Sequence, residues 1–423
     1  MSSSPVAGGA SSGGSAFGGH ERGSRGYRRM TLALFAAGVA TFSQLYSVQG
    51  VLPELAADQR VSESTAALAV SMSTLGLTVA VIPWSLLADR RGRRSTMRLS
   101  LTAAVVLGLL VPFAPTFEVL LGLRFVEGLA LGGIPAIALA YLTEEVSPIA
   151  AAVASGTYIS GTSLGGLFGR IVAGPLSEFI SWRAGTLVVS VLAAVAGVIF
   201  FLTAPAPRGF VPVVRHSSRD IPLARKLLTC LKDRRLVVLF AQGGLLMGGF
   251  VAVYNYLGFR LQAPPFLLPA ALSSLLFLAY LSGTWSSAFS GRLAARRGRL
   301  PVLLGSAGLM LLGLVTTGAG WLPAVVLGLL VFTAGFFAAH ATASGWVPRL
   351  VKTGRAQASS LYNLAYYGGS SLFGWAVGLA FQSLGWGGVV VAVGAMILLA
   401  MLLAWGVLRG EPSGPREPSD STL

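Results

Sequence analysis

Charged residues, histidine and cysteine are scarce in this sequence of 423 residues, and each shortage excludes a class of protein. Only 11% of the residues are charged, whereas a soluble domain carries about 25%. A water-soluble globular protein is therefore excluded. One cysteine, Cys230, permits neither an intrachain disulfide nor a cysteine metal cluster. With three histidines in the chain, we expect no histidine metal site either.

Catalytic and nucleotide-binding motifs are also missing. We find no Ser-His-Asp set and no G-x-x-x-x-G-K-(S/T) loop, so we expect neither an enzyme nor an ATP-driven pump. We find no filter-like sequence that would favour a channel. We therefore expect no cofactor and no metal, and the proton gradient as the energy source.

Long apolar runs dominate the sequence, which is 54% hydrophobic and has a mean hydropathy of +0.73. A helix that spans a bilayer needs about 20 apolar residues. Twelve runs are long enough: 30–52, 66–88, 96–114, 117–143, 148–179, 182–203, 236–260, 268–293, 300–319, 321–346, 356–383 and 386–408. The fold class we predict is an all-α membrane protein.

Positive charge is concentrated between these runs, on one side of the membrane. The net charge of +16 could suggest a nucleic-acid partner, but 26 of the 31 Lys and Arg residues lie in the tails and in alternate loops. Short loops rich in Lys and Arg stay in the cytoplasm. We therefore predict a multi-pass protein of the bacterial inner (plasma) membrane with both termini cytoplasmic. Its expected partners are the lipid bilayer, a small-molecule substrate and protons, with no nucleic acid.

A polar segment divides the chain in the middle. Residues 204–235 are basic and contain proline, so we predict a cytoplasmic linker with a short amphipathic helix near 224–231. Residues 1–29 begin with a Ser/Gly-rich stretch that is too polar to pack, and we predict a disordered cytoplasmic tail. Residues 409–423 form a second tail. The membrane domain then has two parts, 30–203 and 236–408.

The two parts match each other in sequence at an offset of 205 to 207 residues. Four ordered pairs of segments carry the match: 34–38 with 239–243, 90–93 with 296–299, 125–128 with 332–335, and 167–169 with 372–374. Two pseudo-symmetric bundles of six helices are therefore predicted. Two such bundles can enclose a site between them and rock to expose it to one side at a time.

The turn between 66–88 and 96–114 has the most distinctive sequence. Residues 85–98 read SLLADRRGRRSTMR, and a weaker copy, GRLAARRGRLPVL, begins at Gly291. The core of the turn, ADRRGRR, resembles the G-x-L-A-D-R-x-G-R-(K/R) motif of the major facilitator superfamily. Twelve spans arranged as two parallel repeats are also typical of that superfamily. The resemblance implies a twelve-helix transporter, and we expect a monomer.

Further segments resemble one branch of this superfamily. Arg124-Phe-Val-Glu-Gly128 resembles the R-x-x-x-G pattern of drug:proton antiporters. The segments TYISGTSLGGLFGR, TAGFFAAH and QASSLY, which begin at Thr157, Thr333 and Gln357, resemble the acriflavine-sensitivity (YnfM) exporters. The resemblance implies proton-coupled efflux of a small organic compound, which is drug-like, a sugar or a metabolite, by alternating access. The alternative is a proton-coupled importer or facilitator of a small metabolite.

The resemblance implies a conformational latch at Asp89, Arg90, Gly92 and Arg93. In the family the acid meets the amino end of another helix and holds the cytoplasmic face closed. Asp89 with Arg93 would then stabilise the outward-facing state. The alternative is a solvated turn that only sets topology. The second copy has Ala295 in place of the acid, so any latch is asymmetric.

Proton coupling is predicted at Glu127, Arg124 and His340. Arg124 and Glu127 are three residues apart, so they share one face of a helix and can pair. At 1.5 Å per residue, Arg124 lies roughly 12 Å into the membrane, where ionisable groups often mark a pathway or a proton relay. A structural ion pair is the alternative. His340 can exchange protons near neutral pH, or it can be a neutral structural imidazole.

The substrate cavity is predicted from the family, in which the first, fourth, seventh and tenth helices line it. Amides and aromatic residues suit a medium-sized organic molecule. For each of these residues the alternative is an interhelical hydrogen bond. The residues from the first and seventh helices are Thr41, Gln44, Tyr46, Gln49, Tyr254, Asn255 and Tyr256, and we add Tyr158, Asn363 and Tyr366 of the fifth and eleventh helices.

The segment 148–179 combines small residues with one arginine. Gly161, Gly165, Gly169 and Gly174 are spaced to let helices approach closely. The stretch from Gly165 resembles the antiporter motif G-x-x-x-G-P-x-x-G-G, but Arg170 takes the place of the proline. Arg170 either pairs with an acid or binds an anionic group.

Overall fold

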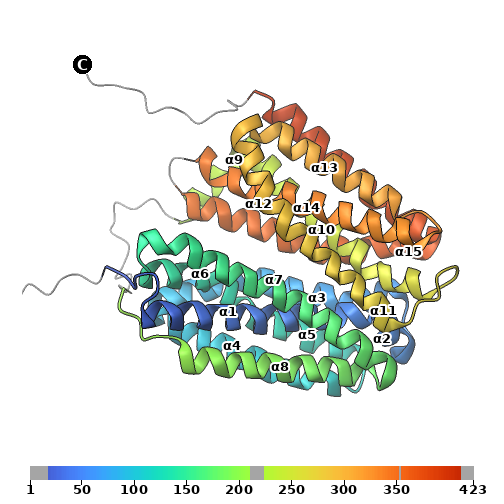
Figure 1. Ribbon diagram of the computed structural model, residues 1–423, viewed down its shortest axis with the longest axis horizontal. Coiled ribbons are helices and arrows are strands. Elements are labelled where there is room, and N and C mark those ends of the chain that lie inside the picture. The colour runs from blue at the N-terminus through green and yellow to red at the C-terminus, as the bar shows by residue number, and fades with distance from the viewer. Residues whose placement is uncertain (1–17, 210–222, 352–353, 411–423) are drawn as a thin grey trace, which may run out of the picture.

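The chain folds into long helices that run roughly parallel to one another (Figure 1). The computed structural model describes residues 18–209, 223–351 and 354–410. Within these ranges it assigns no strand, and one isolated bridge joins His20 to Val146. The predicted all-α fold is confirmed.

The amino-terminal half is a bundle in which several helices are broken by short 3-10 turns. Its elements are α1 (Arg25–Tyr46), η1 (Ser47–Val51), α2 (Leu52–Gln59), α3 (Glu63–Arg91), α4 (Arg93–Leu110), η2 (Val111–Phe113), α5 (Phe117–Leu131), α6 (Gly133–Glu145), α7 (Pro148–Phe179) and α8 (Trp182–Thr203). Together α1, η1 and α2 form the first span, and α5 and α6 form the fourth.

The carboxyl-terminal half repeats this order after a short connecting helix. Its elements are α9 (Leu223–Lys232), α10 (Arg234–Gln262), α11 (Ala270–Leu275), η3 (Leu276–Ala279), α12 (Tyr280–Arg297), α13 (Arg299–Thr316), α14 (Leu322–Leu350) and α15 (Arg355–Leu408). The helix α9 lies where the amphipathic helix is predicted.

Twelve spans can be counted in the described chain. Nine helical segments among the described residues are long and apolar enough to cross a membrane. One of them, α15, contains two spans that meet at Gly385, whose φ of +58° breaks the helix. The other two spans are α7, which has 32 residues, and the broken helix formed by α11, η3 and α12. The predicted twelve-helix architecture is confirmed.

The two halves pack by the same scheme. α1 packs against α7 as α10 packs against α15, and α3 packs against α5 as α12 packs against α14. Across the boundary, α3 contacts α15 and α7 contacts α11. In Figure 1 the blue-to-green half lies below the yellow-to-red half. We call the end with the turns at Gly92 and Gly298 the arginine-rich end, and the end with α2 and α11 the far end.

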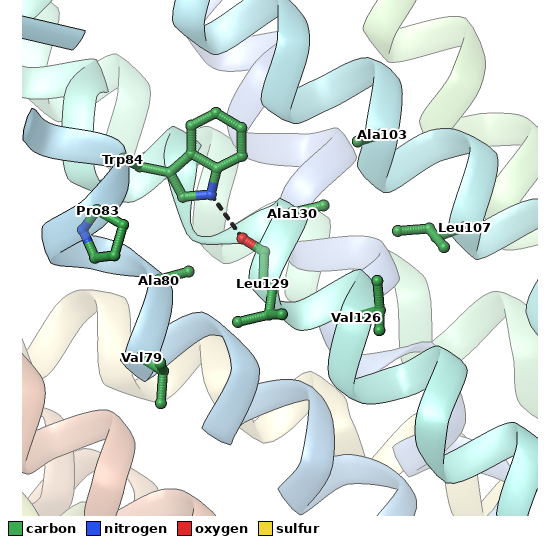
Figure 2. Close-up of a pocket in the computed structure, with 9 residues that line it drawn as sticks. All are labelled: Val79, Ala80, Pro83, Trp84, Ala103, Leu107, Val126, Leu129 and Ala130. Carbon is green, nitrogen blue, oxygen red and sulfur yellow. Dashed lines mark hydrogen bonds between the residues drawn. The ribbon is translucent and has the colours of Figure 1, made fainter. Parts of the chain in front are cut away.

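Proline explains the break in the fourth span. Pro135 has no N–H and crowds the carbonyl four residues earlier, so the helix is interrupted between α5 and α6. Two side chains bond to backbone oxygens next to the break. Trp84 Nε1 donates to the oxygen of Leu129 at 2.7 Å, as Figure 2 shows. Ser100 Oγ donates to the oxygen of Ala130 at 2.7 Å.

Glycines set how closely α7 approaches its neighbours. A Cβ atom added at Gly161, Gly165 or Gly169 would collide with the backbone of α1 at residues 35, 39 and 43. These three glycines lie one turn apart and face α1 along its length. Gly174 instead faces Ser274 of α11, so it lies at the boundary between the halves.

Apolar side chains cover the outer faces of the bundles. Val195 and Val198 of α8 are 54% and 57% exposed, and Leu312 of α13 and Leu402 of α15 are 60% and 68% exposed. Such surfaces are stable in hydrocarbon but not in water. The exposed apolar surface therefore agrees with a membrane-embedded protein.

The predicted boundary of the first tail is wrong. The first helix begins at Arg25 instead of residue 30, because Ser24 accepts a hydrogen bond from the N–H of Tyr27 and caps it. Before it, the N–H of His20 donates to the oxygen of Glu145 at 2.8 Å. Residues 18–29 are therefore part of the folded structure. Residues 1–17 of the predicted tail, residues 210–222 of the linker and residues 411–423 lie outside the described ranges.

Candidate functional site

Arg170 of α7 lies at the centre of the largest group of predicted cavity residues, where the two halves meet. Its side chain is 1% exposed. Its Nε donates to Gln49 Oε1 at 2.7 Å, and its Nη1 donates to the oxygen of Gly166 at 2.6 Å. Gln49 Nε2 donates to Asn255 Oδ1 at 2.6 Å, and Asn255 Nδ2 donates to the oxygen of Gly374 at 3.0 Å. This chain of hydrogen bonds joins α7, η1, α10 and α15.

The chain of hydrogen bonds has only one consistent direction. A guanidinium can donate but cannot accept, so the oxygen of Gln49 faces Arg170 and its nitrogen faces Asn255. The oxygen of Asn255 then accepts, and its nitrogen donates to the backbone. Every partner in the chain is neutral. The positive charge of Arg170 is therefore solvated by dipoles and is not neutralised by them.

Three aromatic rings surround the same guanidinium. The central carbon of Arg170 lies 4.1 Å from the ring centroid of Tyr46, 4.8 Å from that of Tyr280 and 5.1 Å from that of Phe277. Ring faces attract cations, and more strongly away from water. Tyr46 is a predicted cavity residue, whereas Phe277 and Tyr280 are not predicted. The resemblance did not assign the broken helix that carries them to the cavity. The only indication in the sequence was that these two aromatic residues lie three apart, in η3 and directly after it.

No carboxylate is available to Arg170 from the carboxyl-terminal half. Residues 236–408 contain neither Asp nor Glu. The second terminal nitrogen of Arg170, Nη2, has no hydrogen-bond partner among the described residues. The hydroxyls of Tyr46 and Tyr280 likewise make no hydrogen bond within the described chain. Polar groups that could bind a ligand are thus grouped around a terminal nitrogen whose N–H groups make no hydrogen bond within the described chain.

His340 and two further tyrosines lie on the carboxyl-terminal side of this group. His340 Nδ1 is 2.9 Å from the hydroxyl of Tyr362, and its ring centroid is 4.6 Å from that of Tyr366. A series of ring contacts connects His340 to the surroundings of Arg170. The ring centroid of Phe336 lies 6.0 Å from that of His340, Phe250 lies 4.0 Å from Phe336, and Tyr280 lies 5.3 Å from Phe250.

Four other predicted cavity residues have different surroundings. The hydroxyl of Tyr254 forms a 2.7 Å hydrogen bond with Thr333, a residue that was not predicted. Tyr256 donates to the oxygen of Gly374 at 3.1 Å, so it ties α10 to α15. Tyr158 is 5% exposed. Asn363 is exposed and has no hydrogen-bond partner in the described ranges.

Arg124 and Glu127 form a buried ion pair inside the amino-terminal half. Arg124 Nη1 and Glu127 Oε2 are 2.6 Å apart, and the side chains are 0% and 1% exposed. Arg124 also donates to the oxygens of Gln44, Leu45 and Ala69 at 2.7 to 3.1 Å. The first two are carbonyls at the end of α1, and that of Gln44 also accepts from the N–H and the hydroxyl of Ser47. Arg124 thus caps a broken helix as well as pairing with Glu127.

Glu127 points away from the carboxyl-terminal half. Its Oε1 and the amide of Gln44 both lie against Gly108 of α4. The Gln44 amide makes no hydrogen bond within the described chain, and neither does the buried hydroxyl of Thr41. The structure places the partners of Glu127 in the amino-terminal half, because α4 and α5 lie next to each other there.

The predicted latch residues form a network at the arginine-rich end. Arg93 Nη1 is 2.5 Å from Asp89 Oδ1, and Arg93 Nη2 is 2.9 Å from Glu144 Oε1. Gly92 allows the turn with a φ of +89°, which other residues rarely adopt, while Arg90 is exposed. Glu144 was not predicted, because it lies 51 residues away and only the fold brings the end of α6 to this turn.

The pocket in Figure 2 is separate from the Arg170 group. It has a volume of about 340 Å³ and is lined by α3, α4 and α5. Its lining residues are apolar apart from the indole N–H of Trp84, which is already bonded. Val79 and Val126 at its edge are 54% and 45% exposed. It therefore opens towards the surrounding bilayer.

Known proteins resemble this chain over most of its length. The family model described as Major Facilitator Superfamily matches residues 32–374. An uncharacterised MFS-type transporter of Bacillus subtilis, YybF, is 40% identical over 90% of this chain and 94% of its own. The inner membrane transport protein YnfM of Escherichia coli is 39% identical over 90% of this chain and 91% of its own.

Solved structures resemble the fold at lower sequence identity. The nucleoside transporter NupG gives a TM-score of 0.74 at 15% identity, covering 90% of this chain and 100% of its own. A bacterial homologue of the human lysosomal transporter Spinster gives 0.75 at 15% identity, covering 92% of this chain and 99% of its own.

We predict that Arg124→Met lowers the free energy of unfolding by about 3–5 kcal/mol, because Glu127 would remain buried without its partner. The double variant Arg124→Met/Glu127→Leu should recover part of this loss. The control is Arg183→Met, which removes an exposed pair with Asp58 that is worth about 0–1 kcal/mol. Denaturant unfolding in detergent measures all three. Equal losses for Arg124→Met and Arg183→Met would contradict the capping role.

Proposed function

This chain belongs to the major facilitator superfamily, and from that premise we propose that it exports a small organic compound in exchange for protons. The compound binds between the two halves, and the halves rock to expose it to one side of the membrane at a time. No ATP is needed, because proton entry drives the cycle. The exported compound is drug-like, a sugar or a metabolite.

The distribution of contacts between the halves carries this proposal. Side-chain hydrogen bonds between the halves within the described chain occur towards the far end. They join Gln49 to Asn255, Gln262 to Glu54, Glu178 to the N–H of Ala271, and Ser371 to the oxygen of Ser71. At the arginine-rich end, Arg93 pairs with Asp89 and Glu144 of its own half. Hydrogen bonds between the halves that are grouped towards one end are consistent with one state of a rocking transporter.

The arginine-rich end is assigned to the cytoplasm in this proposal. Its turns and the chain ends carry most of the Lys and Arg residues, and such segments stay inside. Both termini are then cytoplasmic. The far end, where the halves touch, faces outward, so the state described corresponds to a transporter closed to the outside.

Glu127 is our proposed proton carrier. It is the buried carboxylate nearest the middle of a span, whereas the buried Glu145 lies at the end of α6 and accepts from the N–H groups of Arg208 and Gly209. Protonation of Glu127 would weaken its pairing with Arg124, which caps α1 beside Tyr46. Through Arg124, the protonation state of Glu127 would then affect the first span. His340, bonded to Tyr362, is the second candidate.

Import is the second candidate function. The antiporter motif in α7 has Arg170 in place of a proline, and this substitution favours a transporter that differs from the drug exporters. Direction can be tested with everted and right-side-out membrane vesicles that respire. Ethidium, uridine, xylose and benzoate serve as labelled probes. Proton-driven accumulation in everted vesicles supports export, whereas accumulation only in right-side-out vesicles supports import.

We predict that Glu127→Gln reduces proton-driven accumulation to the level of vesicles without the protein. Glutamine keeps an acceptor for Arg124 but cannot bind and release a proton. Exchange of labelled for unlabelled probe without a gradient should continue, because exchange needs no net proton movement. Glu118→Gln is the control, since this exposed acid lies on the same helix. Undiminished driven accumulation in Glu127→Gln would remove Glu127 from the coupling step.

We also predict that Asp89→Asn slows turnover about tenfold or more while changing probe binding by less than about twofold. The neutral amide loses the charge-assisted bond to Arg93 that positions the turn. Because the turn is far from Arg170, probe binding should change little. Transport rates in proteoliposomes and binding by thermal shift give the two values. Arg91→Gln, an exposed neighbour on the same turn, is the control. Parallel loss of turnover and binding would argue against a latch.

A further inference from the structure

We propose that Arg170 is the centre of an anion-binding site, so that the transported compound is a small organic anion with one carboxylate or phosphate group. This inference rests on the proposed transport function and specifies its substrate class. It excludes a cation or a neutral sugar as the preferred cargo. The ligand would lie between the halves, in contact with both.

The first argument is the burial of an unbalanced charge. Arg170 is 1% exposed, and each hydrogen-bond acceptor that it meets is a neutral amide or backbone oxygen. A buried charge is strongly destabilising unless it is paired. Arg124 in the same half shows the usual solution, since it pairs with Glu127 at 2.6 Å. A bound anion would give Arg170 the pairing that Arg124 already has.

The second argument is that the protein itself offers no acid for this role. The carboxyl-terminal half has no Asp or Glu between residues 236 and 408. In the middle of the amino-terminal half, Glu127 is already paired and points towards α4. One oxygen of Glu54 and one of Glu178 bind Gln262 and the N–H of Ala271 at the far end, and no ion pair joins either acid to Arg170 among the described residues. A ligand is therefore the source of negative charge in this proposal.

The third argument is the set of donors left free. Arg170 uses Nε and Nη1 within the protein and leaves Nη2 without a partner among the described residues. Tyr46 and Tyr280 lie against the guanidinium, with ring centroids 4.1 and 4.8 Å from its central carbon. One oxygen of a carboxylate can accept from Nη2 and the other from a tyrosine hydroxyl. Charge-assisted bonds of this kind are the strongest in proteins.

The aromatic side chains near Arg170 indicate what the rest of the ligand could be. Tyr254 stacks on Phe277 at 5.2 Å between ring centroids, and His340 lies 4.6 Å from Tyr366. Aromatic walls favour a ligand body that is flat or has an apolar face. Arg170 and Tyr46 belong to the amino-terminal half, whereas Tyr280 and Tyr366 belong to the other. A bound anion would therefore bridge the halves, as the substrate of a rocking transporter must.

The test is thermal unfolding of the purified, full-length protein with matched probes. Benzoate, gluconate and glycerol 3-phosphate supply an anionic group, and benzamide, glucose and glycerol are their neutral counterparts. Benzylammonium supplies a cation. We expect at least one anion to raise the unfolding midpoint in a saturable way, and its neutral counterpart to have no effect. A shift with glycerol 3-phosphate alone indicates a phosphate-ester ligand, whereas a shift with benzoate or gluconate alone indicates a carboxylate ligand.

Variants assign the effect to Arg170. Arg170→Gln should weaken the apparent affinity for the anion by about tenfold or more, as expected for a lost charge-assisted bond. Gln49→Glu should place a carboxylate beside Arg170, raise the midpoint without ligand and abolish the response to the anion. Arg183→Gln, which alters an exposed arginine on α8, should respond like the unmodified protein.

Several outcomes would overturn the proposal. They are equal shifts with an anion and its neutral counterpart, a larger shift with benzylammonium, no shift with any of the anions, and an anion response that survives in Arg170→Gln and Gln49→Glu. Binding needs neither a proton gradient nor transport. If the Arg170-dependent shift is present but energised vesicles accumulate no probe, the anion site stands and proton-coupled export fails.

Discussion

The hydrogen-bond chain from Arg170 through Gln49 and Asn255 to Gly374 is the interaction on which the rest of this structure depends. It is the polar connection that passes through four spans and crosses the boundary between the halves. Because a guanidinium only donates, it sets the direction of each amide in turn. The chain therefore holds the halves together near the far end while it leaves a positive charge without a counter-ion.

Two buried arginines solve the same physical problem in different ways. Arg124 has a carboxylate and three backbone oxygens, so its charge and its donors are satisfied within one half. Arg170 has neutral partners, aromatic ring faces and one terminal nitrogen without a partner among the described residues. The first arrangement needs no ligand, whereas we propose that a ligand completes the second. This difference separates the part of the membrane domain that maintains structure from the part that can recognise a substrate.

The architecture could be predicted from the sequence because apolar length, charge asymmetry and the repeat each depend on local sequence alone. The turns at Gly92 and Gly298 illustrate this, with φ values of +89° and +86° in the two copies. The side-chain partners could not be predicted, because they depend on packing. Glu144 meets Arg93 and Tyr280 meets Arg170 only after distant helices come together. For the same reason, sequence spacing placed Arg124 beside Glu127 but gave no indication that the pair faces α4.

Rocking of the halves about this boundary is the central claim, and paired spin labels test it directly in lipid nanodiscs. With Cys230 replaced by serine, one labelled pair at positions 91 and 296 reports on the arginine-rich end, and another at 57 and 263 reports on the far end. We predict that benzoate together with a change from pH 8 to pH 5.5 shortens one distance and lengthens the other. Two distances that stay fixed, or that change in the same direction, would contradict the account.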